Sequence, residues 1–166
     1  MKKLSLTPKR WLLTLHLLFS AILLGTTVVF LVLSIVAIST DEQNVLNACF
    51  TVMHVLSRTS VKASTIGVVV TGVLLSVLTK WGLFRFYWII LKEAMTLVVI
   101  GVAIIGFYFW TLQAVSMVAQ NPAGSVFTVN NMQLFGGIIL QVLLLATMFV
   151  LSIFKPWGQR KTVNRK

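Results

Sequence analysis

Four long apolar runs constrain the fold of this chain more than any other feature. They cover about residues 11–38, 63–79, 83–110 and 133–154. A membrane-spanning helix needs roughly 20 apolar residues. Because 58% of the 166 residues are hydrophobic and only 10% are charged, a water-soluble core of this size cannot hide the apolar surface. The sequence therefore predicts an all-α fold, a four-helix transmembrane bundle that forms a single domain over residues 1–166.

The distribution of charge predicts how this bundle lies in the membrane. Lysines and arginines flank one set of helix ends, at residues 2–10, at residues 80–85 and in a basic tail over 155–166. On the other side lie Asp41 and Glu42 and an uncharged second loop over residues 113–131. The positive-inside rule then places both termini in the cytoplasm of a bacterial plasma membrane. The net charge of +11 suits anionic lipid headgroups rather than nucleic acid, for which no folded basic module remains.

Residues 43–62 are amphipathic rather than uniformly apolar. The polar side of this segment consists of Asn47, Thr51, His54 and Arg58. Joined to the run over 63–79 as one helix, the segment would reach roughly 50 Å at about 1.5 Å per residue, which exceeds a bilayer core of about 30 Å. It therefore either projects from the outer side of the membrane or lies along that surface and bends near Ser60.

Few ionisable residues lie inside the runs, and in lipid each of them needs a partner or a role. Glu93, next to Lys92, is the only acidic residue in any run. Counted from the basic ends, His16, Lys92 and Met148 share one depth, roughly 10 Å into the membrane. His16 also lies on one helical face with Ser20, Thr27 and Ser34, and we expect that face to look into the bundle.

This polar layer has a functional and a structural interpretation. As a cofactor site it would hold haem b, with His16 as the axial ligand of the iron, Met148 on the opposite face, and Arg85 or Lys92 near the propionates. Glu93 could orient the second ring nitrogen of His16. As structural residues, His16 would bond across helices, Lys92 would extend to the headgroups and Met148 would pack in the core.

Three segments carry a resemblance to a known family. WLLTLHLLFSAILLG, GVLLSVLTKWGLFRFYWIILKEAMTL and SIFKPWG resemble an uncharacterised family of bacterial four-helix integral membrane proteins, a domain of unknown function found in Bacillus-like organisms. More distantly, the stretch from His16 to Gly25 is similar to the first helix of bacterial membrane protoporphyrinogen oxidases and copper-resistance D proteins. Trp88 and Lys92 resemble a tryptophan and a lysine that open helix three of those oxidases. The distant likeness implies a haem or porphyrin site.

Three functions remain open from the sequence. The favoured one is a non-catalytic accessory or assembly protein, and the alternatives are a haem- or porphyrin-binding redox protein and a small proton-linked transporter. Ala21 and Gly25 form a small-xxx-small pair that would let a neighbouring helix approach closely. A membrane protein partner, or a homo-oligomer that forms through glycine-lined faces, is a further expectation. No set of residues indicates a particular enzymatic reaction, so catalysis stays open.

Overall fold

The computed structural model describes residues 6–78, 86–120 and 125–154, with side chains in the last range from Asn130 onward. Every element in these ranges is helical, and four of the helices are long and apolar enough to cross a membrane. The prediction of an all-α, four-helix bundle is therefore confirmed, and the helices fit a multi-pass membrane protein.

Two of the four long helices contain a π-helical turn, in which backbone hydrogen bonds join residues five positions apart instead of four. The first long helix is α1 (Leu6–Ser39). The second runs through α2 (Gln43–Leu56), the π-helical turn η1 (Ser57–Val61) and α3 (Lys62–Leu78); the third runs through α4 (Tyr87–Ile100), η2 (Gly101–Gly106) and α5 (Phe107–Gln120); the fourth is α6 (Ser125–Phe154).

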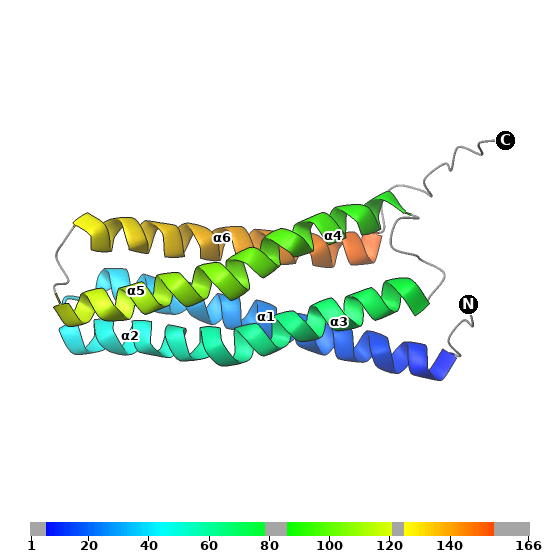
Figure 1. Ribbon diagram of the computed structural model, residues 1–166, viewed down its shortest axis with the longest axis horizontal. Coiled ribbons are helices and arrows are strands. Elements are labelled where there is room, and N and C mark those ends of the chain that lie inside the picture. Colours follow the sequence, from blue (N-terminus) through cyan, green and yellow to red (C-terminus); the bar gives the residue numbers. More distant parts are fainter. Residues whose placement is uncertain (1–5, 79–85, 121–124, 155–166) are drawn as a thin grey trace.

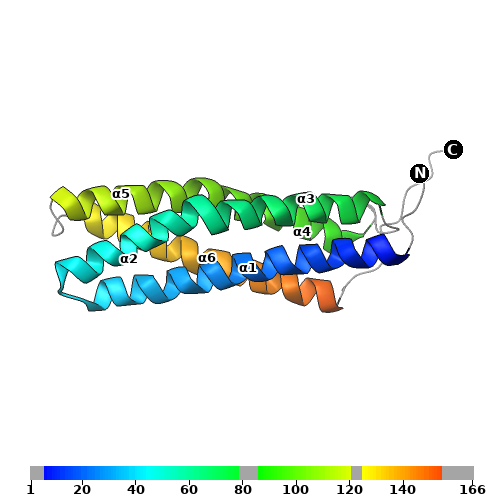
Figure 2. The ribbon, with the colours of Figure 1, turned by 90° about the horizontal axis from the view of Figure 1, so that it is seen from below.

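The long helices lie side by side, each antiparallel to the next (Figures 1 and 2). The second packs against the first and the third, and α6 packs against the first and the third. The turns η1 and η2 contact each other halfway along the bundle. We call the end where α1 begins and α6 ends the basic end, because Lys9 and Arg10 lie there, and the opposite end the far end.

Residues 43–62 continue into the second apolar run as one helix, Gln43–Leu78, of 36 residues. Ser60, where the sequence suggests a bend, lies in the π-helical turn η1. Helix α1 begins at Leu6, earlier than the predicted residue 11. Pro8 permits this start, because the first turn of a helix makes no backbone N–H bond of its own.

The predicted loop over residues 113–131 is wrong, since α5 extends to Gln120 and α6 begins at Ser125. The buried residues of α5 recur every three or four positions and make a continuous stripe: Phe107, Thr111, Ala114 and Val118. This stripe packs against α2, whose own buried face includes Phe50 and Met53. Helix α4 starts at Tyr87 rather than at residue 83, because Phe86 is extended, with φ −124° and ψ 137°.

The core lies between the four helices. Phe30 of α1 and Phe107 of α5 meet across the bundle with ring centroids 5.0 Å apart. Thr27 and Ser34 are buried, which confirms that the polar face of α1 looks inward. Threonine and serine are tolerated there because Thr27 donates to the Leu23 carbonyl at 2.8 Å. The interior is therefore apolar with isolated polar positions.

Candidate functional site

His16 lies against α3 and forms the first part of a polar cluster in the basic half of the bundle. Its Nδ1 is 2.9 Å from the Thr71 hydroxyl oxygen. That hydroxyl donates its only proton to the Gly67 carbonyl at 2.6 Å. When the Thr71 proton is donated to Gly67, the Nδ1–H of His16 is the donor to Thr71, and Nε2 is the acceptor of the neutral ring. A Cβ at Gly72 would lie 3.3 Å from His16 Cε1, so the glycine gives the ring room on α3.

Lys92 forms the second part, in a network that joins α4 to α6. Its Nζ donates to the Ser152 hydroxyl at 2.7 Å, and Ser152 donates in turn to the Met148 carbonyl at 2.8 Å. Thr96 donates to the Lys92 carbonyl at 2.7 Å and lies 3.7 Å from Met148 Sδ. The Lys92 ammonium is near enough to His16 for their charges to interact. Lys92 thus bonds Ser152 inside the bundle and links α4 to α6.

Glu93 follows Lys92 directly and is the least satisfied ionisable residue of the cluster. Its Oε1 is buried and has no hydrogen-bond partner among the described residues. Neither His16 nor Lys92 therefore bonds this oxygen. Arg85, which the haem interpretation places near the propionates, lies outside the described residues, as does the basic tail over 155–166. An unpaired carboxyl oxygen inside an apolar bundle marks a place where a proton or a ligand can bind.

The two expected haem ligands have different partners in the bundle. His16 contacts Thr71 of α3, whereas Met148 contacts Thr96 of α4. An apolar cavity of about 220 Å³ lies elsewhere, between α3 and the α4–η2 helix, and borders on Thr65 and Ile104 but on neither His16 nor Met148. The described residues contain no group of three metal-ligating side chains. Haem binding stays a prediction to which this geometry adds no support.

The polar interior extends beyond the cluster to positions that the sequence analysis misses. Gln141 of α6 is fully buried, and neither its oxygen nor its nitrogen has a partner in the described residues. The Thr65 hydroxyl of α3 is likewise buried and unpartnered among them. The signal for Gln141 was present in the sequence, because it is a single amide in the middle of the apolar stretch GGIILQVLLLA.

His54 forms a second pair of the same kind toward the far end. Its Nδ1 is 3.1 Å from the Thr111 hydroxyl, which donates to the Phe107 carbonyl at 2.6 Å. Its ring also packs against Tyr108, with centroids 5.5 Å apart. The sequence indicates a polar stripe here, and the structure turns His54 toward α5. Both histidines therefore bond a threonine on the neighbouring antiparallel helix.

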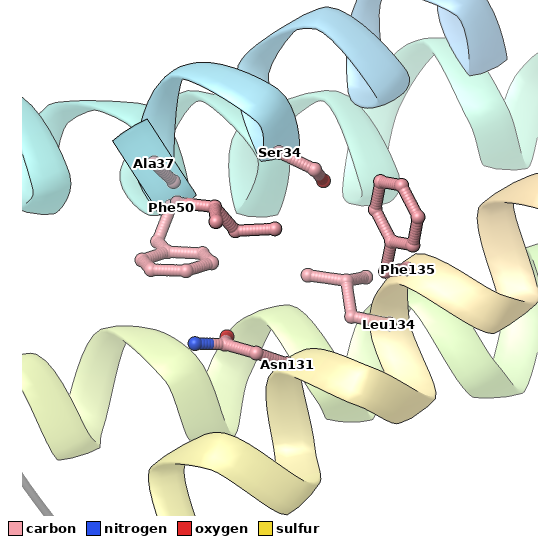
Figure 3. Close-up of a pocket in the computed structure, with 7 residues that line it drawn as sticks. Ser34, Ala37, Phe50, Asn131, Leu134 and Phe135 are labelled. Atoms are coloured by element: carbon pink, nitrogen blue, oxygen red, sulfur yellow. The ribbon is translucent and has the colours of Figure 1, made fainter. Parts of the chain in front are cut away.

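A cavity of about 10 Å³ at the far end borders on Ser34 of α1, Phe50 of α2 and Asn131 of α6 (Figure 3). This volume suits one water molecule. Figure 3 shows the Ser34 hydroxyl and the Asn131 amide on different walls. The Asn131 Oδ1 is buried without a partner in the described part, and Ser34 lies 3.7 Å from Met53 Sδ. Polar groups thus continue to the far end of the bundle.

Comparison with known proteins identifies no relative. The chain matches no protein-family model, and no curated protein or solved structure is significantly similar to it. The resemblances drawn from its sequence segments stay predictions.

Proposed function

We propose that the protein is a small proton-linked transporter in which Glu93 is the proton-binding group. The observation that carries this proposal is the buried Oε1 of Glu93, which has no partner among the described residues and belongs to the residue that follows Lys92 in α4. Ionisable residues inside a membrane are expensive, and they typically belong to proton relays or substrate paths. A purely structural carboxyl would instead be fully bonded.

The rest of the interior supports the same function. Polar side chains occur along the whole length of the bundle, from His16 near the basic end to Asn131 near the far end. An assembly protein that only packs against a partner has no need of unpartnered groups inside its own core. A transporter needs them, because a solute or proton that leaves water must find hydrogen-bonding groups at successive depths.

The orientation follows from charge. We place the basic end in the cytoplasm of a bacterial plasma membrane, where Lys9 and Arg10 meet anionic headgroups. Glu93 then lies in the cytoplasmic half of the bundle, and the turn with Asp41 and Glu42 faces outward.

Proton flux tests the proposal directly. The purified protein is reconstituted into vesicles that contain a pH-sensitive dye, and acidification is followed under an imposed potential. We expect Glu93→Gln to reduce the flux to the rate of protein-free vesicles while the circular dichroism spectrum stays unchanged. Glu42→Gln is the matched control, since Glu42 is exposed in the far-end turn. A Glu93→Gln protein with the flux of the wild type would remove Glu93 from any proton path.

A second candidate, an assembly role, is favoured by the outer face of α1. Ala21 and Gly25 are exposed, and a Cβ at Gly25 would meet no atom within 4 Å. A helix from another membrane protein, or from a second copy of this chain, could approach α1 closely there. The test is chemical cross-linking in native membranes, where Gly25→Leu should abolish a cross-linked species and Ile35→Leu, at an exposed position off the Ala21–Gly25 row, should leave it. Cross-linking that persists in Gly25→Leu would exclude this face.

A further inference from the structure

Gln141 is a fully buried hydrogen-bonding residue that lies outside the cluster described above. Its side chain is 0% exposed, and both amide atoms lack a partner among the described residues. A primary amide offers two N–H donors and an oxygen with two lone pairs. Leaving all of them unbonded costs free energy, and in most proteins such a group is bonded to the protein or to water. Its complete burial also keeps another protein chain from reaching it.

The register of the helices places Gln141 at the level of the π-helical turns. Helices α4 and α6 are antiparallel, and Lys92 bonds Ser152 while Thr96 contacts Met148. A residue four positions later on α4 therefore lies opposite a residue four positions earlier on α6. Continuing this register brings Gln141 opposite η2, the turn that packs against α6 and touches η1. Such turns are rare in helices and frequently mark functional sites.

Gln141 also lies between the two polar ends of the interior. About 16 Å of helix rise separates it from Ser152, the partner of Lys92. By the same rise, Thr111, the partner of His54, lies about 12 Å from the middle of η2 in the opposite direction. The residues one turn away on α6, Ile138 and Leu145, are buried and apolar. On α6 the amide therefore stands alone between buried apolar residues, while Ser57 of η1 and Thr65 of α3 are buried polar residues of the second long helix close to the same level.

We infer that Gln141 binds water in the middle of the bundle and that this water is one step of the proton path between the Glu93 cluster and the far end. The inference rests on the proposed proton transport and names the carrier of the proton at this depth. A water that accepts a proton from one neighbour releases another to the next, so the amide itself is unchanged. Water fits because the buried neighbours Ile138 and Leu145 carry no charge that would hold an ion, and water is the smallest molecule that can bond the amide.

The first test is proton flux in Gln141→Met, whose side chain has similar length and no hydrogen-bonding amide. Gln133→Met is the control, since Gln133 is exposed on the same helix. We expect Gln141→Met to lose the flux and to unfold at a similar temperature, because it removes a buried amide that no described protein group bonds. Gln133→Met should keep the flux. A Gln141→Met protein that carries protons at the wild-type rate would overturn the inference, even where Glu93→Gln is inactive.

A second measurement separates this inference from the proposed function. Hydroxyl radicals generated by X-ray pulses label buried side chains only where bound water supplies the radical. We expect labelling of Ile138 or Leu145 in the wild type and a several-fold decrease in Gln141→Met. If the wild type carries no protons but shows this labelling, the transport function fails and the water site stands. Without labelling of either residue in the wild type, the water site is refuted whatever the flux.

Discussion

Two adjacent glycines of α6 should respond in opposite ways to the same substitution. A Cβ at Gly137 would collide with the Trp110 ring, coming 3.0 Å from Cη2 and closer still to Cζ3. A Cβ at Gly136 would meet no atom within 4 Å. Gly106 lies against the same edge of the ring, where a Cβ would lie 2.8 Å from Cη2. The edge of the indole therefore lies close to both glycines, and a methyl group added at Gly137 forces the ring or α6 to move.

The magnitude follows from comparing the two variants with each other. Overpacking a filled core costs about 1–3 kcal/mol. Replacing glycine by alanine in a helix is intrinsically favourable by up to about 1 kcal/mol, and this contribution is the same for neighbouring positions and cancels in the comparison. Gly137→Ala should therefore be less stable than Gly136→Ala by about 1–3 kcal/mol, which is about 5- to 150-fold in the unfolding equilibrium.

The assay is reversible unfolding of the purified protein in mixed micelles with increasing dodecyl sulfate, followed by tryptophan fluorescence and circular dichroism. Trp110→Phe provides the internal control, because a smaller ring leaves room for the added methyl group. In the Trp110→Phe background the difference between Gly136→Ala and Gly137→Ala should shrink toward zero. Equal stability of the two alanine variants in the wild-type background would refute the close contact between Gly137 and the Trp110 ring.

Three further predictions concern the polar cluster. His16→Ala and Thr71→Val should each lower the free energy of unfolding by about 0.6–1.7 kcal/mol. The double variant should lower it by less than the sum of the two, because the two residues share one hydrogen bond. Additive losses would contradict that bond. Ser152→Ala should lower the free energy of unfolding by about 1–3 kcal/mol in the same assay, because it removes the acceptor of the Lys92 ammonium. In a Lys92→Met background the same substitution should change the free energy of unfolding very little. An equal loss in both backgrounds would contradict the Lys92–Ser152 hydrogen bond. The oxidised and dithionite-reduced absorbance spectra of protein expressed with haem available should show no Soret band; a band lost in His16→Ala would instead favour the haem function.

The four-helix fold was predictable because apolar runs of this length have few alternatives in water or lipid. The helix ends were less so. Hydropathy detects what lies in lipid, whereas α5 and the first half of the second long helix are held by pairing their amphipathic faces. The stripe through Phe107, Thr111, Ala114 and Val118 was visible as a helical period, but its partner on α2 depends on the register between helices.

The sequence predicted that the residues of the candidate site lie at one level along the bundle, but it could not predict their hydrogen-bond partners. Counting from the basic ends placed His16 and Lys92 at one level, and the structure brings them near each other. The bond from His16 to Thr71 could not be predicted, because rotating α3 by one residue would present a different side chain. Gln141 needed no register, since a lone amide in an apolar run already signals either a partner or a ligand.

Some glycines of the bundle pack against side chains of the same chain, whereas others have free space beside them. This difference allows a test of whether transport and assembly are linked. A Cβ at Gly67 would come within 2.5 Å of the Phe19 ring, so that glycine serves contacts inside the chain, whereas Gly25 is open to a partner. If the proton path runs within one chain, Gly25→Leu should abolish cross-linking and leave the flux intact, because the interior around Glu93 and Gln141 is untouched. A flux that falls with the cross-link, with the fold unchanged by circular dichroism, would show that a second copy completes the path, and transport and assembly would then be one function.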